Sequence, residues 1–382
     1  MASSAKRVGL PLALSVVLAV CGFGEDTSGR WVDVEFPHDS PVLFVSFSLG
    51  STTARVLRAS MALDLHTSLQ LRNTGNKTIC GLTLRVEAQD LTPSGKGSVT
   101  VPSLSVQPGE VFPVRIDMKL LRPLNVVKND GAMVQVTLDC ALFSDLSSYG
   151  PDKLDSRRAL TVYELEARRD RRYLAGLLDT GRLAQLREEL NFGLQDRTPP
   201  QLGLELLRSP ASAPKGEQAV NVGTVLFASS PVQPMGGAAR VLGNQVRAPQ
   251  VEVKNRSQKA VRSIEMGWIV RDELGRDFVA GSMPASMQLA PVETGTLTEP
   301  GMLRFSHAAG QPLLIGALMA FVGNVEFADG NLWIPSRRDI AEATNDLVLR
   351  RALAASPEQQ RLAEIYRKRG INALAAELKR VN

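Results

Sequence analysis

Cysteine and histidine are scarce in this sequence, with three of each among 382 residues. No histidine has another histidine, a cysteine or paired carboxylates at metal-ligand spacing. A Gly-x-Ser-x-Gly nucleophile elbow is also lacking, and no glycine-rich loop lies in the βαβ context that phosphate binding needs. The sequence therefore predicts no catalytic residue, no metal and no cofactor, and we expect a protein that is not an enzyme. The histidines are His38, His66 and His307.

A strong excess of charge of either sign is lacking as well. Basic residues number 44 and acidic residues 39, which leaves a net charge of +5. Because the two signs are mixed, the composition argues against a nucleic-acid-binding protein. Long apolar runs are also missing, and none reaches the roughly 20 residues of a membrane-spanning helix. We therefore expect no transmembrane helix in the mature chain.

The N-terminus has the pattern of an export signal, predicted over residues 1–22. Lys6 and Arg7 precede an uncharged stretch over 8–20, and small residues follow. The sequence LAVC at 18–21 resembles the lipobox of bacterial lipoproteins, in which the cysteine is acylated, so Cys21 is a candidate for lipidation. Cleavage by an ordinary signal peptidase after Cys21 or Gly22 is the alternative. The prediction is an exported protein, periplasmic or extracellular, with a lipid anchor left open.

What the sequence does have is an internal duplication. Residues 69–90 align without a gap with 251–272, so that Asn73 falls on Asn255 and Lys77 on Lys259. Both copies alternate apolar and polar residues on either side of an Asn-led turn, which predicts two antiparallel strands joined as a hairpin. A proline-containing turn, a Phe-x-Asp ending and a Ser-Arg-Arg sequence follow in each copy. The chain is thus predicted to contain one unit twice.

Each copy ends in a segment with the apolar spacing of a helix face. Ser356, followed by Pro, Glu and Gln, is predicted to cap the start of the second helical segment. Gly181 and Gly370 lie in the middle of their segments and predict a break into two short helices in each. We therefore expect a helical hairpin after each set of strands.

Together these patterns predict a mainly β fold of two tandem antiparallel immunoglobulin-like β-sandwiches, each followed by a short α-helical hairpin. The expected boundaries are 30–163 for the first sandwich, 164–192 for its hairpin and 218–340 for the second sandwich. The C-terminal helices are expected over 341–382. Proline and serine are frequent in 193–217, which predicts a linker between the two copies.

Cys80 and Cys140 are the cysteines that follow the predicted signal. Each shares strand parity with apolar residues of the first copy, and both are missing from the second copy. An exported protein permits disulfides, so the two are a candidate pair. Such a bridge would contribute on the order of 4 kcal/mol in the chain-entropy model. Two buried free thiols are the alternative.

The turns of the first copy carry a resemblance to a known family. NTGN at 73–76 and VQPGE at 106–110, each next to a strand, are similar to bacterial immunoglobulin-like domains of the cell-adhesion-related type and to those appended to secreted glycosidases. The similarity spans roughly 65–136, and a weaker version lies in the second copy. This resemblance implies a non-catalytic exported module used for spacing, adhesion or partner binding, and it implies no catalytic residue.

Two candidate binding sites follow. Trp333 comes after a turn, where an exposed tryptophan can bind a sugar or a protein partner. Packing in the core is the alternative for this residue. Arg367, Lys368 and Arg369 form a basic cluster in the last helical segment, suited to anionic headgroups or a surface polymer, with a solvated helix face as the alternative.

We therefore expect a non-catalytic binding or scaffolding protein whose partner is a protein or a cell-envelope polymer. A carbohydrate-binding or enzyme-accessory module of the envelope is the second hypothesis.

Overall fold

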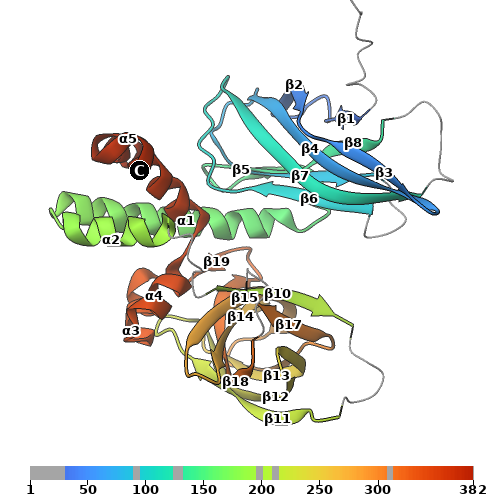
Figure 1. Cartoon of the computed structure of the whole chain (residues 1–382). Coiled ribbons are helices and arrows are strands. Elements are labelled where there is room, and N and C mark those ends of the chain that lie inside the picture. The colour runs from blue at the N-terminus through green and yellow to red at the C-terminus, as the bar shows by residue number, and fades with distance from the viewer. Residues whose placement is uncertain are drawn as a thin grey trace, which may run out of the picture.

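The computed structural model of this protein describes residues 31–88, 95–123, 132–194, 201–208, 215–307 and 313–381. The predicted export signal and the lipidation candidate Cys21 lie outside these residues. The fold is mainly β, as predicted, with two β units and a set of helices between and beside them (Figure 1).

The first β unit consists of two sheets that face each other across an apolar core. One sheet has the order β1-β8-β5-β6 with β9 beside β8, and the other has the order β2-β4-β3 with β7 beside β4. Period-two alternation along these strands buries leucine, valine and isoleucine side chains between the sheets. The strands are β1 (Val32–Glu35), β2 (Val42–Leu49), β3 (Thr53–Leu57), β4 (Ser60–Asn73), β5 (Ile79–Glu87), β6 (Lys96–Val101), β7 (Val111–Pro123), β8 (Val134–Phe143) and β9 (Ser148–Tyr149).

The second β unit is a closed barrel of eight strands around its own apolar core. The ring runs β11-β12-β13-β17-β10-β15-β14-β18 and closes by a parallel pairing of β18 with β11. Two short strands, β16 and β19, pair with β13 and β18. The strands are β10 (Gln201–Leu207), β11 (Gln218–Val225), β12 (Val232–Leu242), β13 (Gln245–Asn255), β14 (Val261–Asp272), β15 (Asp277–Leu289), β16 (Thr294–Thr298), β17 (Met302–Ser306), β18 (Ile315–Phe327) and β19 (Leu332–Trp333).

The expectation of two tandem immunoglobulin-like sandwiches is therefore wrong. Closure of the second unit depends on β10, which arises within the 193–217 segment that composition predicted to be a linker. This strand pairs with β17 on one side and β15 on the other, and so joins two strands that would otherwise be edges. Proline and serine frequency did not reveal it because the alternating residues of the strand occupy only the middle of the segment.

The duplication itself is confirmed at the level of strand register. The pairing of β5 with β8 contains two bulges, and the pairing of β14 with β18 has bulges at the equivalent positions. Residues that the sequence aligns therefore occupy the same place in both units. Ile79 pairs with Phe143 in the first unit, as Val261 pairs with Phe327 in the barrel. In the same way, the pair Gly81–Leu142 corresponds to Ser263–Glu326, and the pair Thr83–Cys140 corresponds to Glu265–Asn324.

The predicted hairpin at the start of each copy is not formed. β4 and β5 are consecutive in the chain but lie in different sheets, and β13 and β14 are not paired in the barrel. Period-two alternation is the same for a hairpin and for two strands on opposite walls of one core, so the pattern alone could not separate the two arrangements.

Five helices complete the described fold: α1 (Ser156–Asp179), α2 (Leu183–Leu194), α3 (Arg337–Ala343), α4 (Leu347–Ala354) and α5 (Pro357–Val381). The predicted breaks are confirmed. Gly181, with a φ of 67°, lies between α1 and α2, and Gly370, with a φ of 79°, kinks α5. A glycine tolerates these left-handed φ values without strain. The predicted N-cap is confirmed as well, because the Gln359 amide donates to Ser356 Oγ at 3.2 Å.

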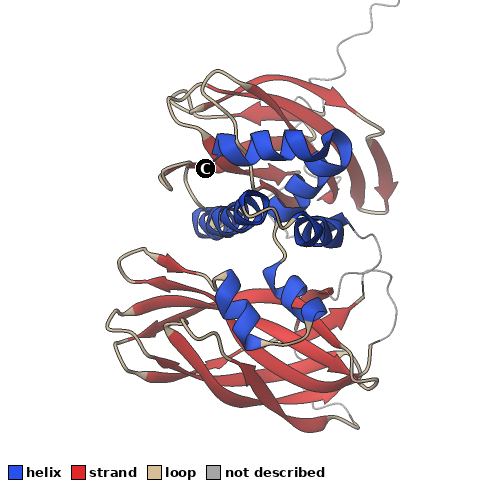
Figure 2. Ribbon diagram, turned by 90° about the vertical axis from the view of Figure 1, so that its left-hand side faces the viewer, coloured by secondary structure: helices blue, strands red, loops and turns tan. Residues whose placement is uncertain are grey.

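The two helical tails pack against each other and form one body, which we call the helical hub (α1, α2 and α5). Its core consists of leucines that the duplication relates to one another, with Leu174 equivalent to Leu362 and Leu186 equivalent to Leu374. Figure 2 shows the helices lying between the two β units. Each tail thus buries its apolar face against the copy of itself.

α1 also connects the two β units. On one side Leu160 packs against Cys140 and Leu142 of the first unit. On the other side Arg158 reaches β14 and β18 of the barrel. The short helices α3 and α4 cover another part of the barrel wall, where Ile340 and Leu349 are buried. In the part of the chain that the structure describes, no helix is long and apolar enough to span a membrane.

Candidate functional site

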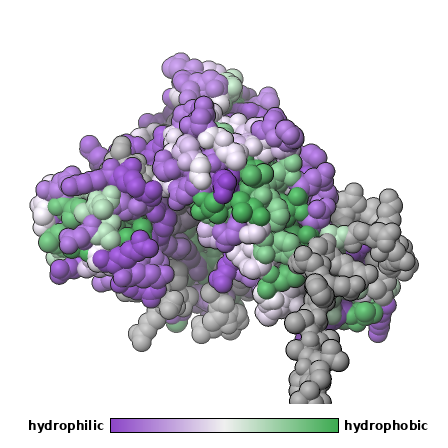
Figure 3. All heavy atoms as spheres, turned by 90° about the horizontal axis from the view of Figure 1, so that it is seen from above, coloured by the Kyte–Doolittle hydropathy of each residue, from purple (hydrophilic) through white to green (hydrophobic). Residues whose placement is uncertain are grey.

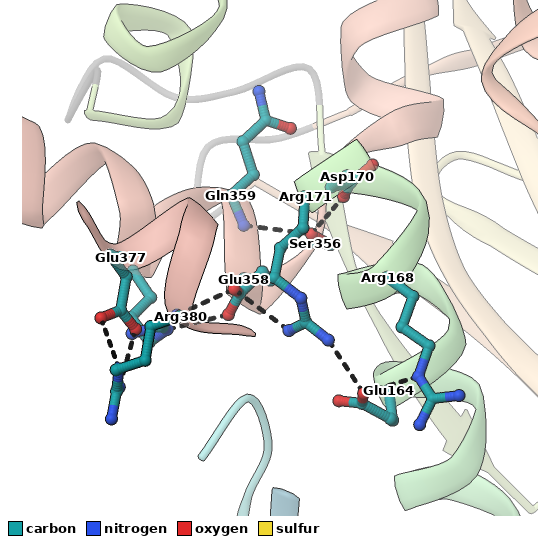
Figure 4. A network of polar contacts seen from close by, with 10 residues as sticks. Glu164, Arg168, Asp170, Arg171, Ser356, Glu358, Gln359, Glu377 and Arg380 are labelled. Atoms are coloured by element: carbon teal, nitrogen blue, oxygen red, sulfur yellow. Dashed lines mark hydrogen bonds and ion pairs between the residues drawn. The ribbon is translucent and has the colours of Figure 1, made fainter. Parts of the chain in front are cut away.

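A chain of buried ion pairs lies where α1 meets α5 (Figure 4). The guanidinium of Arg171 donates to Glu164 at 2.9 Å and to Glu358 at 3.2 Å. Glu358 is fully buried and also accepts from Arg361 at 2.8 Å, and Arg361 continues to Glu377 at 2.7 Å. Each buried charge has an opposite charge beside it, and breaking such a pair typically costs about 3–5 kcal/mol. The network therefore fixes how the two tails meet.

A second buried cluster surrounds Asp170 on the same helix. Its carboxylate accepts from Arg337 at 2.8 Å, from Arg169 at 3.0 Å and from the hydroxyl of Ser356 at 2.5 Å. Burial by itself raises the pKa of Asp170, but the charges of Arg169 and Arg337 and these hydrogen bonds outweigh it, so the pKa lies below its ordinary value. Asp170 thus remains ionised and holds the starts of α3 and α5 to α1.

Glu166 has the opposite electrostatic environment. Burial raises the pKa of this carboxyl to about 7, which Arg169 opposes and the nearby Asp170 and Glu265 reinforce. Glu265 belongs to the barrel and Glu166 to α1, so the repulsion between them acts across the contact between the hub and the second unit.

The contact between α1 and the barrel is polar. Arg158 is 6% exposed and donates to Asn324 Oδ1 at 2.6 Å, with Glu326 at 3.4 Å and Glu265 at 3.6 Å as further partners. Asn324 in turn donates to Glu265 at 2.6 Å. These residues occupy the barrel surface that is equivalent to the apolar patch under Leu160 in the first unit.

The comparison of the two units also shows where Cys80 and Cys140 lie. Cys80 and Cys140 are buried and free, so the candidate disulfide is not formed. The bulges turn both side chains out of the core, and Cys140 lies opposite Thr83, three residues or about 10 Å along the strand from Cys80. A disulfide requires Cα atoms within about 7 Å. In the second copy the position equivalent to Cys140 is Asn324, which accepts from Arg158 of α1, and the position equivalent to Cys80 is Arg262, which pairs with Glu326 on the barrel surface.

A basic cleft lies between α1, the end of α5 and the edge of the first unit. Its volume is about 550 Å³, and four arginines line it together with one carboxylate, Glu164. Hydroxyl and amide side chains from the first unit form the opposite wall. The lining residues are Thr78, Cys80, Ser105, Gln107, Ser144, Glu164, Arg168, Arg171, Arg172 and Arg380.

A second cleft, which we call the aromatic cleft, lies on the other side of Arg172. It has a volume of about 580 Å³, and the candidate residue Trp333 lines it with Tyr173 and Arg338. Trp333 is partly buried, packs against the barrel core and donates from Nε1 to Ser229 Oγ at 3.3 Å. Packing therefore holds the tryptophan in place, as the core-packing interpretation expects. The same side chain also lines the cleft, so it stays a candidate binding residue.

The predicted basic cluster lies at the end of the first half of α5, away from both clefts. Arg367, Lys368 and Arg369 are exposed, and the first two share Glu364 at 2.8 and 2.9 Å. Exposed ion pairs within one helix are typical of a solvated helix face, which was the alternative to an anion-binding cluster. The structure places the denser group of arginines on α1 instead.

The face of the hub that is seen from above the first unit is mostly hydrophilic (Figure 3). In Figure 3, which views the molecule from above the first unit, apolar side chains gather over that unit, and the projecting hub is largely covered by hydrophilic ones. The apolar faces of the tails, which the sequence suggested as docking surfaces, are covered by one another. Exposed apolar residues of the first unit include Leu43 and Val45 on β2.

Among the described residues, no group of three or more histidine, cysteine, aspartate or glutamate side chains is placed to hold a metal ion. His66 instead pairs with Asp117 at 2.7 Å and with Asp64 at 3.3 Å on the surface of β4 and β7. The structure thus brings arginines and carboxylates of α1 and α5 together, and these were not among the predicted site residues. The signal that could have found them is that Glu164 and Arg171 share the helix face of Leu174.

No known protein family matches the sequence, and no curated protein matches it. Among solved structures, the chain has a weak likeness to a transglutaminase of red sea bream, with 8% identity, coverage of 74% of this chain and 31% of that chain, and a TM-score of 0.13. A β-glucosidase from Kluyveromyces marxianus gives 8% identity, coverage of 69% and 45%, and a TM-score of 0.15. The chain spans less than half of either protein. Likenesses this weak carry no conclusion about fold or activity, and neither structure identifies the immunoglobulin-like family that the turn motifs resemble.

Proposed function

We propose that this protein is an exported, non-catalytic scaffolding or binding protein that presents two β units in a fixed relation. The observation that carries the proposal is the helical hub, in which the tails of the two repeats share one core of buried leucines. The ion pairs of Glu358 and Asp170 add a geometric constraint, because each joins α1 to segments that follow the barrel. The N-terminal export pattern supports the location.

Fixed geometry is useful to a scaffold because partners bound to the two units are then held at a defined distance. A flexible tether would lose that property, since the ends of a flexible linker sample a wide range of separations. Nothing in this role requires a catalytic group, and the buried charges of the hub serve to position the helices. The partner is expected to be a protein or a polymer of the cell envelope.

The distance between the units tests the proposal directly. Spin labels at the exposed residues Arg55 on β3 and Glu252 on β13, in a Cys21→Ser background, are expected to give one narrow distance distribution by pulsed electron resonance. A double change of the hub core, Leu174→Asp with Leu362→Asp, is expected to broaden it, because a buried carboxylate opens the contact between the tails. A broad distribution in the unmodified hub would contradict a rigid scaffold.

A second candidate function is carbohydrate binding, and the aromatic cleft favours it. Trp333 and Tyr173 offer aromatic surface in an open cleft that is also lined by arginines. Trp333→Ala is expected to abolish retention on immobilised envelope glycan, with Trp268→Phe, a change inside the barrel core, as the control for packing. Retention that survives Trp333→Ala would remove this candidate.

A further inference from the structure

The basic cleft carries more positive charge than its carboxylates balance. Arg168 and Arg171 both donate to the same oxygen of Glu164, at 2.8 and 2.9 Å, so one carboxylate serves two guanidinium groups. Three further charged residues, Glu358, Glu377 and Arg361, lie behind the lining. When they are counted with the lining residues, the cleft has five arginines and three carboxylates. The cleft therefore attracts anions.

Arg172 is the arginine of this group that has no ion pair among the described residues. It is exposed on α1 and lines the cleft. Its neighbours on the helix, Arg168 and Arg171, are both engaged with Glu164. An unpaired guanidinium that lines a cleft can donate two parallel hydrogen bonds to a bound carboxylate or phosphate.

Two buried polar atoms of the cleft lining also lack a partner among the described residues. Glu164 and Arg171 are each 3% exposed, yet Glu164 Oε2 and Arg171 Nε make no hydrogen bond. A buried donor or acceptor left unpaired costs about 1–3 kcal/mol. One of these atoms is an acceptor and the other a donor, and both belong to side chains that line the same cleft (Figure 4).

We infer that the basic cleft binds a small hydroxylated anion, of the class of sugar acids and sugar phosphates. The anionic group would accept from Arg172 and from Arg171 Nε, and a neighbouring hydroxyl would donate to Glu164 Oε2. Thr78, Ser105 and Gln107 on the opposite wall supply further polar contacts for hydroxyl groups. The volume of about 550 Å³ is that of a small-molecule site, which typically has about 300–1,000 Å³.

This inference deepens the binding part of the proposed function, because it names a ligand class and a site. The two can fail separately. The spin-label experiment measures the geometry between the units, whereas the present test measures the affinity of one cleft for a small molecule.

Isothermal titration of the full chain tests the inference with four probes: glucuronate, glucose 6-phosphate, glucose and inorganic phosphate. Glucuronate, glucose 6-phosphate or both are expected to bind, and glucose is expected not to bind. Which of the two anions binds more tightly identifies the anionic group. Arg172→Gln is expected to weaken binding about ten-fold or more, since it removes a charge-assisted contact from a side chain outside the buried network.

Two matched variants separate this site from others. Arg182→Gln changes another exposed arginine near the end of α1 that does not line the cleft, and it is expected to leave affinity unchanged. Trp333→Ala alters the aromatic cleft, which Arg172 also lines, and is likewise expected to leave affinity unchanged.

Several results would overturn the inference. These are no binding of either charged sugar at about 10 mM, equal binding of glucose, or the same affinity in Arg172→Gln. Binding of inorganic phosphate as tight as that of glucose 6-phosphate would overturn the role given to Glu164 as the hydroxyl acceptor.

Discussion

At the scale of single residues, the two asparagines that begin the turns after β4 and β13 have the same role. Each is fully buried. Asn73 donates from Nδ2 to the carbonyl oxygens of Lys77 and Val106, at 2.9 and 3.0 Å, and accepts from the amide of Gly75. Asn255 makes the equivalent bonds in the barrel. The prediction that these residues form turns is confirmed by their contacts, and the turns carry the chain from one wall of the core to the other.

Asn73→Ala is expected to lower the free energy of unfolding by about 2–4 kcal/mol, because the Lys77 carbonyl and the Gly75 amide lose their partner and the Val106 carbonyl keeps only the Ile79 amide. Chemical denaturation measures the change. Asn76→Ala, at an exposed position of the same turn, is the matched control and should have little effect. Equal effects of the two substitutions would show that the buried amide has no special role.

Glu166 predicts a pH dependence that can be read from the direction of its shift. The folded pKa of about 7 is above the ordinary value of 4.5, so the folded state holds the proton more tightly than the unfolded state. This contribution to stability is fully present below about pH 4.5 and is lost as the pH rises through 7. Glu166→Gln, which is neutral throughout, should therefore become more stable than the parent by about 2–3 kcal/mol as the pH is raised over this range.

Unfolding free energies of the two proteins, measured from pH 4.5 to 8, check this expectation. A difference between them that stays constant over the range would mean that Glu166 ionises normally in the folded protein.

At the scale of elements, α1 determines how the repeats fit together. Its faces contact the first unit through Leu160, the barrel through Arg158 and the other tail through Leu174 and Arg171. The helical segment was predicted from its apolar spacing. Two of its arginines, Arg158 and Arg171, are buried, because Glu326 of the barrel and Glu358 of α5 lie beside them. Glu326 and Glu358 lie more than 150 residues away from these arginines in the chain, so no local pattern contains them.

Glu358→Gln is expected to destabilise the protein by about 3–5 kcal/mol, because it leaves Arg171 and Arg361 with too little negative charge inside the hub. Thermal and chemical denaturation both measure this. Glu364→Gln is the control on the same helix, since its partners Arg367 and Lys368 are exposed, and it should change stability little. A tolerated Glu358→Gln would show that the buried ion pairs do not hold the tails together.

At the scale of the whole molecule, the hub couples two units that each have their own core. Because α1 contacts both units and the opposite tail, we expect the parent protein to unfold in one calorimetric transition. Leu174→Asp together with Leu362→Asp should separate it into two, since each unit then unfolds without the other. Two resolved transitions in the parent would contradict the coupling.

The sequence by itself determined the duplication, the mainly β class, the helical tails and their breaks at Gly181 and Gly370. These depend on local periodicity, turn residues and caps, and such signals lie within a few residues of one another. Only the tertiary structure decided that the second unit closes into a barrel through β10, that Cys80 and Cys140 face α1 without pairing, and that the tails cover each other around buried charges. Each of these outcomes depends on which distant segment supplies the last hydrogen bond, apolar surface or counter-charge, and alternation along one strand or helix is the same whichever segment that is.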